Sequence, residues 1–106
     1  MAEIHIPFTK QFKEPMLSGR KTVTSRTRRH GYAGDTFQAW GRTFEIIGVH
    51  KMLLITVRDL WYEDEGCKSP KEFEDTWMKL HRRRGFVPEE VVWLHEFKLL
   101  DREEKP

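Results

Sequence analysis

The chain begins with a regular alternation of apolar and polar residues. Within residues 3–8, Ile4, Ile6 and Phe8 fall on one side of an extended backbone, and polar residues fall between them. This two-residue period is typical of a strand with one buried face. We therefore predict that residues 3–8 form the first strand of the domain.

A short helical segment is expected next, over residues 10–17. Pro15 prevents a long regular helix here, and Gly19 supplies a natural stop after it. Beyond Gly19 the chain becomes rich in residues that favour extended backbone. These residues predict strands over 21–26, 35–40, 43–49 and 91–100, with β character continuing through the apolar run 52–57.

Glycines mark two irregularities in the expected sheet. The pair Gly41-Arg42 is a plausible hairpin connection between the second and third of these strands. Gly48 lies inside a strand pattern, where a glycine often marks a bulge. The segment 27–34 is basic and then interrupted by glycines, so it is expected to be a surface loop.

The longest helix is predicted over residues 69–84. Ser69 is suited to the N-cap, Pro70 to the first helical position, and Glu72 completes a capping-box pattern. Apolar residues then recur at helical spacing along one face. Gly85 provides the stop.

Together these elements predict an α+β fold. We expect a small, curved, mainly antiparallel sheet or small β-barrel, with one main helix and short helical segments. At 106 residues the chain has the length of one domain. We place this domain at residues 1–101 and a polar C-terminal tail at residues 102–106.

The overall charge says little about a partner. Lys and Arg number 19 against 17 Asp and Glu, for a formal net charge of +2, so attraction to a polyanion must come from local clustering. Cys67 is the only cysteine, which fits a reducing compartment, and no apolar run reaches the length of a membrane span. We expect a cytoplasmic protein with no membrane partner.

The strongest local cluster of charge lies just after Gly19. Five cations fall within ten residues: Arg20, Lys21, Arg26, Arg28 and Arg29. Guanidinium groups make paired hydrogen bonds to phosphate oxygens, so the cluster suits a phosphate-bearing ligand. A solvated basic loop explains the same charges equally well.

An acidic cluster precedes the predicted main helix. Acids near a helix N-terminus are stabilised by its dipole, which accounts for at least two of Glu63, Asp64 and Glu65. The third could face the basic segment and hold its cations in place. Within that segment, strict strand alternation would direct Lys21 and Thr24 to opposite faces.

No metal or cofactor is expected. The five histidines are scattered and no second cysteine joins them, so the sequence has no ligand pair at metal-binding spacing. The sequence also lacks a glycine-rich phosphate-binding loop, and it lacks a motif centred on a nucleophilic serine.

These residues together resemble an ASCH domain, the small branch of the PUA-like barrels. Gly19, Lys21 and Arg26 match the family signature G-x-K-x-x-x-x-R. Further matches follow in the same order along nearly the whole chain: Gly34-Asp35 before a strand, Glu65-Gly66 followed by Ser69-Pro70 and a helix, and the closing strand from Val92-Trp93 to Phe97.

The resemblance implies a cleft lined by the signature lysine and arginine, with RNA or a modified nucleoside as partner. One bacterial branch of the family removes the acetyl group from N4-acetylcytidine with Lys, Thr and Glu. Lys21 and Thr24 match that motif, and Glu65 is the best match for the acid, with Glu63 as the alternative.

Two functions are therefore expected, and the sequence leaves both open. The leading one is RNA or nucleotide binding by Gly19, Arg20, Lys21, Arg26, Arg28 and Arg29. The alternative is an amidohydrolase that uses Lys21, Thr24 and Glu65 as catalytic residues. A protein-interaction module remains a third possibility, and the sequence does not predict the oligomeric state.

Overall fold

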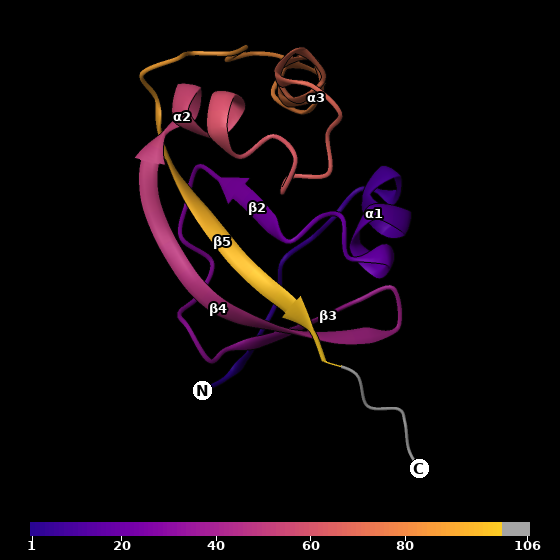
Figure 1. Cartoon of the computed structure of the whole chain (residues 1–106). Coiled ribbons are helices and arrows are strands. Elements are labelled where there is room, and N and C mark those ends of the chain that lie inside the picture. The colour runs from indigo at the N-terminus through magenta and orange to yellow at the C-terminus, as the bar shows by residue number, and fades with distance from the viewer. Residues whose placement is uncertain (101–106) are drawn as a thin grey trace.

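A computed structural model describes residues 1–100, in which a curved five-stranded sheet carries helices on both sides of its short edge strand β2 (Figure 1). The strand order is β1-β3-β4-β5-β2. The strands are β1 (Glu3–Ile4), β2 (Val23–Arg26), β3 (Thr36–Ala39), β4 (Arg42–Leu53) and β5 (Val91–Leu99). The polar tail expected at residues 102–106 lies outside the described residues.

The sheet is mixed and open. β1 pairs with β3 in parallel, whereas the other three pairings are antiparallel. Within residues 1–100, β1 and β2 are the two edges and do not pair with each other. The α+β fold with a curved sheet is confirmed, and the alternative of a closed barrel is wrong because both edge strands are short.

The long strands β4 and β5 run side by side and carry the curvature of the sheet (Figure 1). Their register shifts between Ile46, which pairs with Phe97, and Gly48, which pairs with Glu96. The bulge predicted at Gly48 is therefore confirmed. A bulge bends the strand that contains it, which fits the bend of β4 around the sheet.

The β character predicted for residues 52–57 ends at Leu53, and α2 (Leu54–Leu60) follows. Leu54 and Val57 lie three residues apart, on one face of the helix, and both are fully buried. The free energy of burying these side chains offsets the low helix propensity of the β-branched residues. The Leu54 N–H also donates to the carbonyl of Glu90 at 2.8 Å. This bond satisfies a donor that the first turn of a helix leaves free.

The main helix, α3, spans Pro70–Leu80 and begins as predicted. The Ser69 hydroxyl accepts a hydrogen bond from the Glu72 N–H at 3.1 Å. The helix ends four residues before the predicted end, because the His81 imidazole and backbone N–H both contact the carbonyl of Trp77. The arginines at 82–84 therefore lie in the turn after the helix.

The N-terminal elements are shorter than the sequence suggests. β1 stops at Ile4, and Pro7 has no N–H to extend a ladder. A 3-10 turn, η1 (Lys10–Phe12), leads into α1 (Lys13–Ser18), which ends at Gly19 with a left-handed φ of 87°. The helical segment and its glycine stop are thus present.

Two buried clusters fill the interior. One lies between the sheet and helices α2 and α3, and it consists of Val23, Leu54, Val57, Phe73, Trp77, Val92 and Leu94. The other consists of Ile6, Met16, Phe37, Phe44, Ile46 and Phe97, with the Phe37 and Phe44 rings stacked 5.3 Å apart. None of the described helices is long and apolar enough to cross a bilayer.

Candidate functional site

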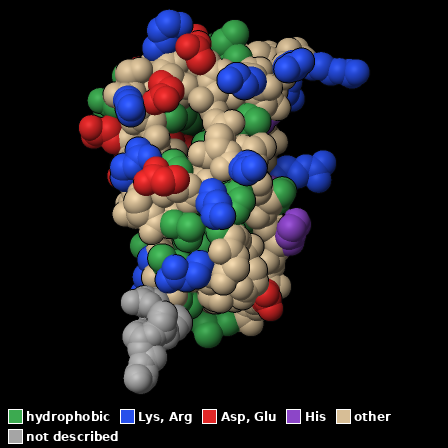
Figure 2. All heavy atoms as spheres, turned by 90° about the vertical axis from the view of Figure 1, so that its right-hand side faces the viewer, with side chains coloured by type: hydrophobic (Ala, Val, Ile, Leu, Met, Phe, Trp, Pro, Cys, Tyr) green, Lys and Arg blue, Asp and Glu red, His purple; other side chains and the backbone are tan. Residues whose placement is uncertain are grey.

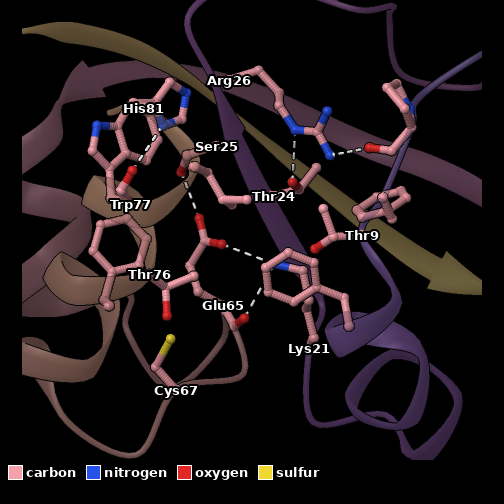
Figure 3. A pocket seen from close by; sticks show the side chains of 15 residues that line it. Thr9, Lys21, Thr24, Ser25, Arg26, Glu65, Cys67, Thr76, Trp77 and His81 are labelled. Atoms are coloured by element: carbon pink, nitrogen blue, oxygen red, sulfur yellow. Dashed lines mark hydrogen bonds and ion pairs between the residues drawn. The ribbon is translucent and has the colours of Figure 1, made fainter. Parts of the chain in front are cut away.

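A pocket of about 290 Å³ opens where the two clusters meet. Figure 3 shows it bounded by β2, by α3 and by the segment that leads into α1. Its apolar lining combines Phe8 and Phe12 from the N-terminal segment with Phe73, Trp77 and Leu80 from α3. Its polar lining includes Lys21, Thr24, Ser25, Arg26 and Glu65. The pocket is therefore an apolar slot with one polar wall.

Lys21 is the most deeply buried polar side chain of this wall, with 1% of its side chain exposed. Its ammonium group donates to Glu65 Oε1 at 2.9 Å, to the Val23 carbonyl at 2.9 Å and to the Glu65 carbonyl at 3.1 Å. An ammonium group has three protons. All three are thus engaged within the protein.

Glu65 connects Lys21 to Ser25. One carboxylate oxygen accepts from Lys21, and the other accepts from the Ser25 hydroxyl at 2.6 Å. The backbones of Lys21 and Glu65 also form an isolated antiparallel bridge. Of the acids at 63–65, Glu65 is thus the one whose carboxylate contacts the signature lysine.

Gly66 allows this close approach. It has a φ of 92°, and a Cβ placed there would lie 3.2 Å from Lys21 Cβ and 3.3 Å from Pro15 Cβ. A larger residue would be strained by its backbone conformation and would press on the lysine stem. The glycine therefore positions the ion pair without contributing any side chain.

Thr24 lines the same pocket but has a different partner. Its hydroxyl oxygen accepts from Arg26 Nε at 3.0 Å, and Arg26 also donates to the Pro7 carbonyl at 2.7 Å. Among the hydrogen bonds of residues 1–100, none joins the Thr24 hydroxyl to Lys21 or Glu65. Lys21 nevertheless shares the pocket with Thr24, because β2 begins only at Val23 and strand alternation does not apply to Lys21.

Ser25 is the residue that sequence reasoning missed. It is 7% exposed and contacts the acid directly. In the sequence, a strand predicted from Lys21 onward groups Ser25 with Lys21 by its two-residue period, and this was the signal for Ser25 even though β2 itself begins only at Val23. The family motif drew attention to Thr24 instead.

Two pKa shifts show that burial removes water from side chains that line the pocket. Burial lowers the pKa of Arg26, while the charge of Glu65 opposes that shift. Burial together with the charges of Glu65 and Glu72 raises the pKa of the Cys67 thiol, which also lines the pocket, to about 11. Cys67 is therefore a neutral thiol at neutral pH and a poor nucleophile.

The pocket wall rests on a buried histidine behind β2. His95 is fully buried, and its Nε2 accepts from the His30 backbone N–H at 3.0 Å. Its Nδ1 lies 3.2 Å from the Thr24 carbonyl, which assigns the proton to Nδ1. Burial lowers the pKa of His95, since it favours the neutral ring.

The remaining cations of the basic segment lie outside the pocket. Arg20 forms an exposed ion pair with Glu14. Arg28 and Arg29 are exposed, and the Arg29 guanidinium lies 3.8 Å from the centre of the Tyr32 ring. On the face shown in Figure 2, Lys and Arg side chains are scattered, with Asp and Glu among them, and form no single continuous patch.

The structure offers no obvious metal centre in its described part. No group of three or more His, Cys, Asp or Glu side chains within residues 1–100 is placed to hold a metal ion. The polar wall has an ammonium group where a cation would have to bind the carboxylate.

Comparison with known proteins identifies the fold. No family model and no curated protein matches the chain, but solved structures do. An ASCH domain from Lactobacillus crispatus JV V101 aligns with a TM-score of 0.64 and 16% identity, over 92% of this chain and 78% of that chain. A DUF984 protein from Enterococcus faecalis V583 aligns with a TM-score of 0.64 and 16% identity, over 99% and 83% of the two chains.

A third solved structure, a protein from Pyrococcus furiosus, aligns with a TM-score of 0.61 and 15% identity, over 94% of this chain and 96% of that chain. These alignments extend over nearly the whole described part of the chain. Similarity at this level of identity establishes the fold. The ASCH-like fold expected from the sequence is confirmed.

Proposed function

Taking the ASCH-like fold as the starting point, we propose that this domain binds one nucleobase in the pocket, carried by a nucleoside, a nucleotide or an RNA strand. One observation carries the proposal. An apolar, aromatic slot ends in a polar wall made of Lys21, Ser25 and Glu65. A planar heterocycle needs this combination, because its faces are apolar and its edge is polar.

The aromatic lining supports stacking on the base. Phe8 and Phe12 line the pocket from the N-terminal segment, and Trp77 lines it from α3. The His81 ring stacks on Trp77 with ring centres 4.0 Å apart, so the two rings act as one extended surface. Stacking of a base on an aromatic side chain contributes about 1–3 kcal/mol.

The proposal changes the role expected for Lys21. Its three protons are engaged inside the protein, so it fixes Glu65 rather than contacting a phosphate. In an RNA strand, phosphates on either side of the bound base would instead meet exposed cations such as Arg28 and Arg29. These contacts would make RNA binding more salt-sensitive than nucleoside binding.

Calorimetric titration tests the proposal. Nucleosides and short single-stranded RNA are titrated at two salt concentrations into the wild type and into Phe12→Ala. We expect binding that is weakened roughly tenfold or more by the Phe12 substitution, as the loss of one stacking contact predicts. Tyr32→Ala, an exposed aromatic residue outside the pocket, is the control for nucleosides.

Two binding results would contradict the proposal that the pocket holds a base. If no nucleoside or RNA binds at low salt, or if Phe12→Ala binds as tightly as the wild type, the pocket does not hold a base. Circular dichroism of each variant separates loss of binding from loss of fold.

A second candidate function is hydrolysis of an amide attached to the base, as in N4-acetylcytidine. The observation that favours it is that Lys21, Thr24 and Glu65 all line one pocket. In this scheme the Thr24 hydroxyl attacks the amide carbonyl carbon and its proton passes to Glu65. The C–N bond then breaks, the amine leaves with that proton, and water hydrolyses the acyl ester.

In that reaction Lys21 would stabilise negative charge rather than accept a proton, since three acceptors hold its protons in place. Thr24 would also have to exchange its bond with Arg26 for contact with the substrate. Ser25, which already contacts Glu65, is the competing hydroxyl.

Incubation with N4-acetylcytidine, followed by chromatography for released cytidine, tests this function. Thr24→Ala and Ser25→Ala are compared as a matched pair of adjacent hydroxyl deletions. We expect turnover that only Thr24→Ala abolishes. The absence of cytidine from the wild-type reaction excludes the activity, and full turnover by Thr24→Ala excludes Thr24 as nucleophile.

A further inference from the structure

We propose that the polar wall of the pocket selects bases that carry an exocyclic amino group, and that Ser25 and Glu65 recognise this group. The inference rests on the base-binding function proposed above and specifies the chemical class of base. It follows from which donor protons of Lys21 and Ser25 already form hydrogen bonds within the protein.

The donors of Lys21 and Ser25, the two side chains that contact the Glu65 carboxylate, are engaged within the protein. Lys21 donates its three protons to Glu65 Oε1, to the Glu65 carbonyl and to the Val23 carbonyl. Ser25 has one hydroxyl proton, and the Glu65 carboxylate, which is an acceptor only, takes it at 2.6 Å. Neither side chain retains a proton for a ligand.

The acceptors of the wall are only partly used. Each oxygen of Glu65 accepts one bond from the protein and can accept another, and the Ser25 oxygen keeps its lone pairs. These three atoms lie on one wall of the pocket (Figure 3). The wall therefore presents a group of acceptors to whatever enters.

An amino group complements such a wall, and a carbonyl group does not. An amino group offers two N–H donors that can reach two neighbouring acceptors. A carbonyl oxygen in the same place would face Ser25 and Glu65 oxygens without any proton between them, which leaves buried polar atoms unsatisfied. Cytosine and adenine should therefore be preferred to uracil and hypoxanthine, which carry a carbonyl instead.

Thr24 complements the ring atom beside the amino group. Its oxygen accepts from Arg26 Nε, and within residues 1–100 no acceptor takes its own hydroxyl proton, which can therefore be donated to a ligand. In cytosine and adenine, the ring nitrogen next to the amino group is an acceptor; in uracil and hypoxanthine, it carries a hydrogen. The Thr24 donor and the acidic wall thus favour the same two bases.

Matched nucleoside pairs test the inference by calorimetry. Cytidine is compared with uridine, and adenosine with inosine, since each pair differs by an amino group in place of a carbonyl. The carbonyl member leaves buried polar atoms unsatisfied, so we expect the amino member to bind roughly tenfold tighter in both pairs.

Two variants assign the preference to the wall. Glu65→Gln replaces a pure acceptor by an amide that can donate, and we expect the ratio within each pair to fall toward one. Ser25→Ala removes one acceptor and should reduce the ratio while leaving Lys21 and Glu65 paired. Ser18→Ala, an exposed hydroxyl deletion outside the pocket, should leave the ratio unchanged.

The outcomes separate this inference from the function on which it rests. Equal affinity within both pairs overturns the amino preference while base binding stands. Ratios that stay at the wild-type value in folded Glu65→Gln, or in Ser25→Ala if the first variant does not fold, also overturn it. Failure of all four nucleosides and of single-stranded RNA to bind at low salt overturns base binding itself, and the preference with it.

Discussion

Lys21 and Arg29 lie eight positions apart in one basic segment, yet the structure uses them in opposite ways. Lys21 is buried in the pocket wall, and its ammonium group is bonded to the Glu65 carboxylate and to the carbonyls of Val23 and Glu65. Arg29 is exposed and lies over Tyr32. The comparison teaches that a run of cations in a sequence does not measure the positive charge that a ligand meets.

His95 lies between these two regions. It contacts the Thr24 carbonyl on the pocket side and the His30 N–H on the side of the basic loop. A single buried ring therefore ties the strand of the pocket to the loop that carries Arg28 and Arg29.

Removal of the buried cation should have the largest effect on stability. In Lys21→Met, the Glu65 carboxylate loses its ion pair inside the protein, and such a loss costs about 3–5 kcal/mol. We expect the free energy of unfolding, measured in urea, to fall by that amount. Lys10→Met, at an exposed position, is the matched control and should change it by less than about 0.5 kcal/mol.

The double variant Lys21→Met with Glu65→Leu sharpens this result. Replacing both partners of a buried ion pair by apolar residues is often close to neutral, so we expect part of the lost stability to return. A Lys21→Met variant that is as stable as the wild type would show that the ion pair is not buried in solution.

Cys67 should react slowly, since its environment is that of the pocket wall and not of the exposed loop. With a pKa of about 11 against an ordinary value of 9.0, its thiolate fraction at neutral pH is about a hundredfold smaller than that of a free thiol. Alkylation by iodoacetamide, followed by mass spectrometry, measures this. The urea-unfolded chain is the control, and equal rates in both states would contradict the raised pKa.

His95 should make the stability depend on pH. Burial lowers its pKa in the folded chain, while the unfolded chain takes up a proton near pH 6.5. As the pH falls through this value, the unfolded state binds protons that the folded state does not, so the free energy of unfolding decreases. His30, whose pKa burial also lowers, contributes in the same direction.

Urea titrations between pH 5 and pH 8 measure this slope in the wild type and in His95→Gln. The amide can replace both hydrogen bonds of the ring without titrating, so we expect a shallower slope. His30→Gln gives the share that belongs to the second histidine. A slope unchanged in both variants would contradict the assignment to these two rings.

The exposed arginines should have the smallest effect on the fold. In Arg28→Gln with Arg29→Gln, we expect the free energy of unfolding to stay within about 0.5 kcal/mol of the wild type. Nucleoside binding should also stay unchanged. The plot of log affinity for single-stranded RNA against log salt should become shallower by about 1.4, the value for two phosphate contacts.

The slope of RNA affinity against salt tests directly whether the basic loop takes part in binding. If it is the same in the wild type and in the double variant, the loop contacts no phosphate. The pocket would then bind its ligand without help from the rest of the basic segment.

The fold was largely predictable where local chemistry and tertiary packing agree. The start of α3 follows from Ser69 and Glu72, which satisfy backbone donors within the same turn. Gly48 marked the bulge, because a residue without a side chain weakens a regular strand. In these places the information lies within a few residues.

The sequence was misleading where distant contacts decide the structure. Residues 54–57 favour strand by propensity, but they are helical because Leu54 and Val57 are buried and the Leu54 N–H donates to the carbonyl of Glu90. The partner of Glu65 is likewise set by the approach of two segments 44 residues apart. The motif suggested Thr24 beside the acid, whereas the register of β2 puts Ser25 there.

Gly66 has a consequence for how this protein would respond to mutagenesis. Its left-handed backbone would strain any other residue, and even a methyl group would lie closer to Lys21 and Pro15 than ordinary van der Waals contact allows. A scan of single substitutions would therefore score Gly66 alongside the residues that touch the ligand. Its intolerance to mutation would come from the space that a side chain would need, and not from any contact that Gly66 makes with a ligand.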